Sequence, residues 1–132
     1  MSTPSNTINT VISIIKSAVG DSAAVTKEFT GNKQELPLKS IVISAGIKKT
    51  DVKYIEAEET SSHQRKLVVE ALVCAPKNCS SESIIILLDK IFQKSFESHG
   101  KTITLYGFST DSIRYSSSIC ALILPIYITV GL

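Results

Sequence analysis

The sequence predicts an α+β fold, in which an N-terminal helix and a second amphipathic helix pack on a mainly antiparallel sheet. Two segments repeat apolar residues every three or four positions, as amphipathic helices do. The segments between and after them are dense in β-branched residues, which favour strands. The order of helix, strands, helix and strand pair lacks the alternation of strands and helices typical of parallel sheets, so we expect antiparallel pairing.

Length and composition are those of one globular domain. A chain of 132 residues can bury a core without disulfides or metals, and we expect a single domain over residues 1–132. The hydrophobic fraction is 43% and the mean hydropathy is +0.20, which favours an oligomer because a small monomer hides so much apolar surface poorly. The net charge of +2 is too small for the basic face of a nucleic-acid-binding protein.

Neither a secretion signal nor a membrane span is predicted. The first basic residue is Lys16, and polar residues interrupt the apolar ones before it. The most apolar segment, residues 119–132, is shorter than the roughly 20 residues of a membrane-spanning helix, and it contains Pro125. We therefore expect a buried strand in this segment, no membrane partner, and a protein that stays in the cytosol of the cell that makes it.

The first predicted helix covers residues 7–21, TINTVISIIKSAVGD. Gly20 stands where this helix would end, since glycine readily adopts the conformation that stops a helix. The apolar stripe consists of Ile8, Val11, Ile12, Ile15 and Val19. A short strand is expected next, around residues 24–29, and then a polar surface loop that runs through Gly31 to Pro37.

Two strand segments are expected over residues 38–57, with Gly46 as a bulge or bend between them. Residues 56–65, EAEETSSHQR, are polar throughout and should form a mobile, exposed loop. Residues 65–76 are predicted to be a central strand covered on both faces, because both sets of alternating positions are apolar. One set is Leu67, Val69, Ala71 and Val73, and the other is Val68, Leu72 and Cys74.

The second helix is predicted over residues 80–100. Ser80 can cap its N-terminus, Glu82 favours its first turn, and Gly100 would end it. Its apolar stripe consists of Ile84, Leu87, Leu88, Ile91, Phe92 and Phe96. This stripe is expected to cover the sheet.

The chain closes with two predicted strand regions, residues 101–116 and 118–132. The serine-rich turn at residues 116–118 is short enough for an antiparallel hairpin. Because proline cannot donate to a strand ladder, Pro125 is expected at a sheet edge or a bulge.

The cysteines and histidines do not predict a metal or cofactor site. Cys74 and Cys79 have four residues between them, at the limit for a zinc knuckle. A structural zinc needs two further ligands, and the remaining candidates form no second close pair: they are Cys120, His63 and His99. The three cysteines are an odd number in a chain without an export signal, which predicts reduced thiols.

No phosphate-binding loop, dinucleotide fingerprint or hydrolase motif occurs in the sequence, so we expect no enzyme activity. A nucleophilic cysteine remains an alternative, because Cys74 or Cys79 could meet a histidine in space without being near it in sequence. The glutamates of residues 56–59 lack the glycine and the spacing of a calcium loop, so an exposed acidic segment is expected there.

Four segments occur in an informative order. They are the helix TINTVISIIKSAV, the proline-led strand LPLKSIVISAGIKKTDV, the strand and turn RKLVVEALVCAPKNCSSES that lead into the helix IIILLDKIFQKSF, and the closing pair TITLYGFSTDSIRYSSSICALILPIYITV. This layout covers nearly the whole chain and resembles the tail-terminator (tail-completion) proteins of long-tailed bacteriophages and related phage-tail-like particles. The sequence departs from the family pattern at Cys79 and residues 80–81, where a glycine-rich turn is expected.

The resemblance implies a structural protein without a catalytic centre or cofactor. Six copies would close into a ring on the head-proximal end of the tail tube, end its polymerisation and face the neck or head. The implied partners are further copies of itself, the tail tube protein, a neck or head-completion protein, and the sheath protein if the tail is contractile. DNA would only pass through the lumen. The protein would act in the cytoplasm of the bacterial host during assembly, and then in the virion or tail-like particle.

Two surface segments are candidate interfaces of such a ring. The acidic segment would reach a neighbouring subunit or the tube and become ordered on assembly; its candidate residues are Glu56, Glu58, Glu59, His63 and Arg65. The turn at Pro76 and Lys77 would lie near the ring or its lumen. An ordinary exposed loop and an ordinary turn are the alternatives for these two segments.

Other function classes stay open beside the terminator hypothesis. The nearest is another neck component, such as a head–tail joining or stopper protein. A small cytosolic enzyme would use Cys79 or Cys74 as its nucleophile. A monomeric binding module would recognise a basic partner through the acidic segment at residues 56–65.

Overall fold

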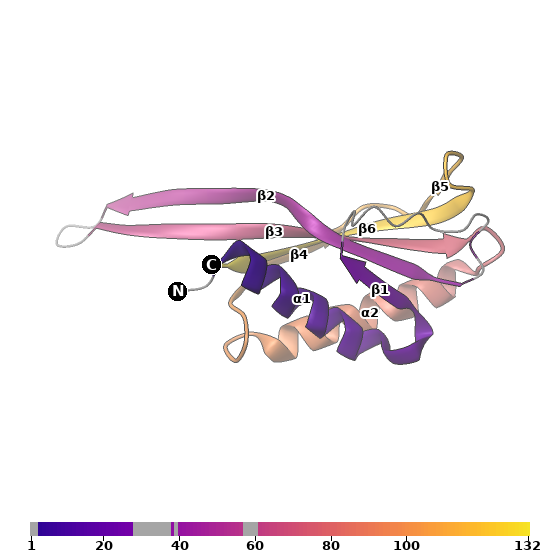
Figure 1. The fold of residues 1–132 in the computed structure, drawn as a ribbon, viewed down its shortest axis with the longest axis horizontal. Helices are drawn as coiled ribbons and strands as arrows, with labels where there is room; N and C mark the ends of the chain where they lie inside the picture. Colours follow the sequence, from indigo (N-terminus) through magenta and orange to yellow (C-terminus); the bar gives the residue numbers. More distant parts are fainter. Residues whose placement is uncertain (1–2, 28–37, 39, 57–60) are drawn as a thin grey trace.

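A computed structural model of the chain describes residues 3–27, 38, 40–56 and 61–132, with the backbone alone over residues 49–56 and 61–64. Two helices lie on one face of a six-stranded, mostly antiparallel sheet (Figure 1). The predicted α+β class is therefore confirmed. No helix in the described part of the chain is long and apolar enough to cross a membrane.

The sheet is assembled from segments that are far apart in the sequence. In chain order the elements are α1 (Pro4–Val19), the short 3-10 helix η1 (Gly20–Ser22), β1 (Ala24–Lys27), β2 (Val42–Glu56), β3 (Ser61–Pro76), α2 (Ser81–Ser98), β4 (Leu105–Thr110), β5 (Arg114–Ser116) and β6 (Ala121–Gly131). The strand order is β1-β2-β3-β6-β4, and β5 also pairs with β6. Among the strands that the structure describes, only β1 and β2 pair in parallel, whereas β4 and β5 pair antiparallel with β6. The predicted antiparallel closing hairpin is therefore confirmed.

Helix α1 forms where the sequence predicts it. The Thr3 side chain caps its first turn by accepting a hydrogen bond from the Asn6 N–H at 3.1 Å. Gly20 ends the helix with a φ of 55°, a conformation that glycine adopts without steric strain. All the predicted stripe residues are buried, together with Thr7 and Ile14.

Helix α2 starts as predicted but buries a narrower face. The Ser80 hydroxyl accepts from the Ser83 N–H at 3.2 Å, which makes Ser80 the N-cap, whereas the helix ends at Ser98, before Gly100. Its buried residues are Ile84, Leu87, Ile91 and Ser95. Phe92 and Phe96 are exposed, so the prediction that the whole stripe is covered is wrong. The buried line continues from Ile91 to Ser95, and the two phenylalanines lie on the adjacent line.

The core lies between the helices and one face of the sheet. Alternate residues of β2, β3 and β6 point into it: Ile43, Ala45, Leu67, Val69, Ala71, Val73, Leu124, Ile126, Ile128 and Val130. Strand β3 is central, as predicted, because it pairs with β2 and β6. The prediction that both of its faces are covered is wrong at Leu72 and Cys74, which are only half-buried because both helices lie on the other side.

Strands β2 and β3 form one long hairpin, which corrects two predictions. The predicted loop at residues 56–65 is largely strand, since Glu56 ends β2 and pairs with Ser61 of β3. Residues 57–60 lie outside the described residues. The irregularity expected at Gly46 falls between Ile47 and Lys49 instead, where Lys48 is the extra residue of a bulge. The polar loop predicted to reach Pro37 also lies outside the described residues.

Pro125 lies in β6, an inner strand, so the predicted edge position is wrong. Its carbonyl accepts a hydrogen bond from the Asp111 N–H at 3.2 Å. Because the N and O of one residue project to the same side of a strand, the proline nitrogen faces the same way. On that side β4 has ended at Thr110 and β5 begins at Arg114. The missing N–H therefore falls in a gap between partner strands.

Candidate functional site

The far end of the β2–β3 hairpin projects beyond the body of the protein (Figure 1). The last pair between β3 and β6 is Lys66 with Gly131, and the Leu132 N–H donates to the Arg65 carbonyl at 3.0 Å. Residues 53–56 and 61–64 therefore pair only with each other among the described residues. We call these two segments the arm. A two-stranded ribbon is only marginally stable in water. The arm is therefore a ribbon that has no third strand among the described residues.

The predicted interface residues fall into two groups at opposite ends of β3. Glu56 and His63 belong to the arm, where His63 pairs with Tyr54, and Arg65 lies at the base of the arm. Glu58 and Glu59 lie outside the described residues. Pro76 ends β3, and its carbonyl accepts from the Cys79 N–H at 2.8 Å. Lys77 is exposed in the turn before α2.

These two groups cannot form one local site. A strand rises about 3.3 Å per residue, so the backbone positions of Arg65 and Pro76 are separated by roughly 35 Å. Each group can contact a different neighbour. The two candidate segments of the sequence are thus two separate surfaces of the molecule.

A polar hollow of about 440 Å³ lies at the base of the arm. Arg65 lines it together with Lys101 and Tyr106, and the first turns of α1 form another wall. The Lys66 ammonium of β3 lies 4.5 Å from the centroid of the Tyr106 ring of β4, which is a cation–π contact within the sheet.

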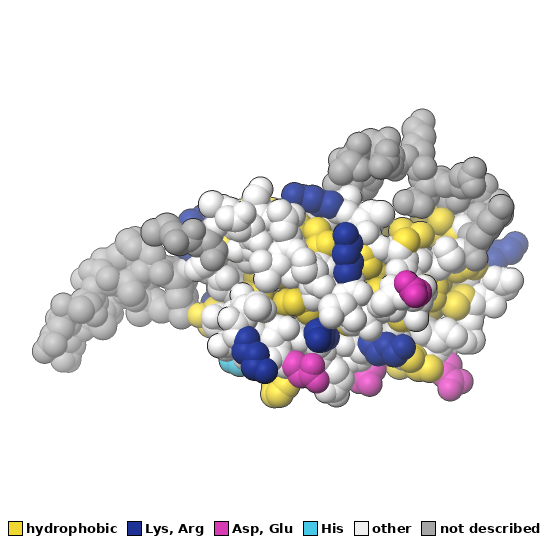
Figure 2. Space-filling view, turned by 60° about the horizontal axis from the view of Figure 1, so that its bottom comes forward, with side chains coloured by type: hydrophobic (Ala, Val, Ile, Leu, Met, Phe, Trp, Pro, Cys, Tyr) yellow, Lys and Arg dark blue, Asp and Glu magenta, His cyan; other side chains and the backbone are white. Residues whose placement is uncertain are grey.

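An apolar groove of about 320 Å³ lies between α2 and β4. Its lining residues are Ile85, Leu88, Asp89, Phe92, Phe108, Ser109 and Thr110. Phe96 extends the apolar surface along α2, with its ring centroid 6.3 Å from that of Phe92. On the side of the molecule that the helices cover, hydrophobic side chains reach the surface between charges of both signs (Figure 2).

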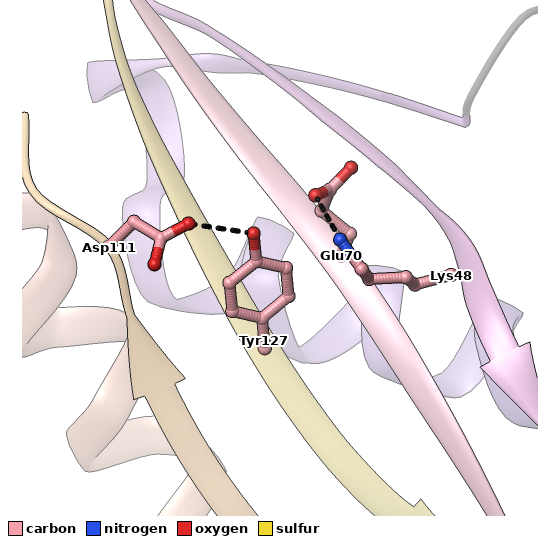
Figure 3. Close-up of polar contacts among 4 residues, drawn as sticks. All are labelled: Lys48, Glu70, Asp111 and Tyr127. Carbon is pink, nitrogen blue, oxygen red and sulfur yellow. Dashed lines mark hydrogen bonds and ion pairs between the residues drawn. The ribbon is translucent and has the colours of Figure 1, made fainter. Parts of the chain in front are cut away.

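The face of the sheet opposite the helices carries a chain of polar contacts (Figure 3). Lys48, at the bulge in β2, lies 3.5 Å from a Glu70 carboxylate oxygen and 4.6 Å from the centroid of the Tyr127 ring. The Tyr127 hydroxyl donates to the Asp111 carboxylate at 2.9 Å. Exposed ion pairs add little stability, so these contacts chiefly fix the relative positions of β2, β3 and β6.

The same contacts shift two pKa values. Partial loss of hydration lowers the pKa of Lys48, but the charge of Glu70, followed by the Tyr127 phenol, raises it by more, and the net shift is upward. The pKa of Tyr127 is raised, first by its hydrogen bond to Asp111 and then by desolvation and the Asp111 charge. Both shifts favour the protonated forms that make these contacts.

The cysteines lie in three different environments. Cys74 is half-buried on β3, and desolvation raises the pKa of its thiol, which disfavours the thiolate that a nucleophile needs. Cys79 packs against the core in the turn before α2, and Cys120 is exposed. Over the described residues, no group of three or more His, Cys, Asp or Glu side chains could hold a metal ion.

Sequence reasoning missed the groove and the polar contacts. The signal for the groove was available, because α2 also has isoleucines at positions 85 and 86, which make its apolar surface wider than one buried stripe. The polar contacts join residues from four separate segments, so no local sequence pattern predicts them; the residues are Lys48, Glu70, Asp111 and Tyr127.

Comparison with known proteins does not assign this chain to a family. No protein-family model matches it, and no curated protein sequence is similar to it.

Proposed function

We propose that this protein is a structural subunit that forms a ring on the head-proximal end of a phage tail tube, or of the tube of a phage-tail-like particle, and ends tube growth. The ring is a hexamer of identical copies. Its other partners are the tube protein, a neck or head-completion protein and, in a contractile tail, the sheath protein. DNA passes through the lumen without being held. The protein acts in the host cytoplasm during assembly and then in the particle.

The arm is the observation that carries this proposal. A β ribbon that leaves the body of its own domain buries its backbone and side chains only against another molecule. The apolar groove between α2 and β4 is a second, different surface on the same subunit. Contacts between unlike surfaces are heterologous, and such contacts generate rings when their rotation closes.

The order of elements gives further support. The helix, the long hairpin, the second helix and the closing strands follow the layout by which the sequence resembles tail-terminator proteins. The turn at Pro76 and Lys77, at the end of β3 away from the arm, supplies a separate surface for the tube or the neck.

The test is the native mass of the purified protein, measured alone and with polymerising tail tube protein, combined with negative-stain images of the same samples. We expect rings of six copies, and tubes of defined length that carry a ring at one end. Tubes grown without the protein should be overlong. A protein that remains monomeric under both conditions, or that leaves tube length unchanged, overturns the proposal.

A further inference from the structure

Strand β4 is an edge of the sheet, and its free backbone groups can be identified. Among the described residues it pairs only with β6. The Asp111 N–H donates to Pro125 on β6, and Ser109 lies opposite Tyr127, so these residues face inward. Because successive residues of a strand alternate in direction, Phe108 and Thr110 point their N–H and C=O groups to the open side.

This edge adjoins the apolar groove. Phe108 and Thr110 line the groove together with Ile85, Leu88 and Phe92 of α2. An extended segment that hydrogen-bonded to β4 would place every second side chain on the α2 side, over these residues. The two features together specify an added strand with apolar residues at alternate positions.

Strand β2 offers an open edge that is long enough to cover β4. Strand β1 pairs with β2 only at Val42–Ala45, and beyond the bulge the outer edge of β2, residues 49–56, has no partner among the described residues. This edge is longer than the six residues of β4. A third strand is what a two-stranded ribbon lacks for stability. Pairing of the two edges would give the arm a third strand and would cover the open edge of β4.

The exposed apolar surface of the groove, together with Phe96 beside it, fits one part of a larger interface. Ile85, Phe92 and Phe96 are 47%, 39% and 64% exposed. Covering them removes roughly 300 Å² of apolar surface from water, given about 200 Å² for a whole aromatic side chain. A stable interface buries about 800 Å² per partner, so strand pairing and the arm must supply the remainder.

We propose that the outer edge of β2 in the arm of one copy pairs with the β4 edge of a second copy, above the groove between α2 and β4. This inference rests on the proposed ring, whose subunit contact it identifies. The arm and the β4 edge lie at the two sides of the sheet, so the contact is head to tail and each copy has one arm and one acceptor edge.

Two variants separate the two halves of the contact. Thr110→Pro blocks the acceptor edge, because its N–H points outward and its loss removes no hydrogen bond to β6. Replacing residues 53–64 by Asn-Gly removes the arm and joins the paired residues Val52 and Arg65 by a two-residue turn. Each variant alone should be monomeric and should still unfold cooperatively, as an intact single domain does.

Mixing the variants gives the decisive measurement. The intact arm of the Thr110→Pro copy should dock on the intact edge of the armless copy, and the product should be a 1:1 dimer, since neither partner can bind a further copy. Phe96→Lys should weaken ring formation at least tenfold, whereas Tyr115→Lys, at a residue that is 52% exposed outside the groove, should not.

The outcomes distinguish this inference from the proposed function. Rings formed by Thr110→Pro, or a mixture that stays monomeric while the natural protein forms rings, overturn the strand contact and leave the ring proposal standing. A natural protein that is monomeric with and without tubes overturns the ring proposal and this inference with it. Loss of rings in Tyr115→Lys as well as Phe96→Lys would contradict the assignment to the groove.

Discussion

The rings of Phe92 on α2 and Phe108 on β4 meet edge to face, with their centroids 5.1 Å apart. This contact joins the second helix to the edge strand of the sheet. Phe92 is 39% exposed, so one side of its ring is packed and the other faces the groove. Phe96, one turn further along the helix, is 64% exposed, and its ring lies farther from that of Phe92, with the centroids 6.3 Å apart.

The first prediction follows from this difference in packing. Phe92→Ala should lower the free energy of unfolding by about 1–2 kcal/mol, because an aromatic pair contributes about 0.5–1.5 kcal/mol beyond the area it buries. Phe96→Ala, the matched control, should change it by no more than about 0.5 kcal/mol, as exposed sites usually do. Urea unfolding of the monomeric Thr110→Pro background measures both. Equal losses for the two variants would contradict the packing described for Phe92.

The second prediction concerns the cap of α2. Ser80→Ala removes the hydroxyl that accepts from the Ser83 N–H, and should lower the free energy of unfolding by about 1 kcal/mol. Ser81→Ala is the control, because this residue lies in the first turn of the helix and makes no side-chain cap. Thermal and urea unfolding measure the effect, and an unchanged midpoint in Ser80→Ala would show that the cap is not formed in solution.

The third prediction concerns pH. The hydrogen bond to Asp111 raises the pKa of Tyr127 in the folded protein. A raised pKa means that the contact stabilises the fold below about pH 10, the usual pKa of tyrosine, and that this contribution is lost as the pH rises through the folded-state value.

Asp111→Ala should therefore lower the pKa of Tyr127 towards its usual value. Absorbance at the tyrosinate band, with Tyr127→Phe subtracted to isolate this residue among the four tyrosines, follows the titration. Glu70→Gln is the control, since Glu70 contributes least to the shift and its removal should move the pKa less than Asp111→Ala does. If the pKa of Tyr127 fell further in Glu70→Gln than in Asp111→Ala, Asp111 would not be the main cause of the raised pKa.

The fourth prediction concerns the thiols. Cys120 is exposed and should react fastest with a thiol reagent at neutral pH, whereas Cys74 should react slowly because it is half-buried and its pKa is raised. Mass spectrometry of partially labelled protein gives the order. Cys79→Ser should leave ring formation unchanged. Rapid labelling of Cys74 would favour the cysteine-dependent enzyme over the structural protein.

Local features of the fold could be predicted because their causes are local. Helix α1 and the start of α2 follow from apolar spacing and from capping residues a few positions apart, Gly20 and Ser80. Strand β3 was recognisable because the residues around Val69 are apolar on both faces of the strand. The polar residues of the arm gave no such signal, since backbone pairing continues the register of the buried part of the hairpin regardless of side-chain polarity.

Sequence by itself determined the α+β class, the two helices and the central strand, because hydrophobic periodicity and caps act over a few residues. Tertiary structure alone decided which line of α2 is buried, leaving Phe96 exposed. It also decided that the missing N–H of Pro125 falls in the gap between two partner strands. It placed Arg65 at the base of the arm, far from Pro76 at the end of β3, and left β4 as an edge. These outcomes depend on which strands pair with one another, and the pairing of strands that are distant in sequence cannot be predicted from any single segment.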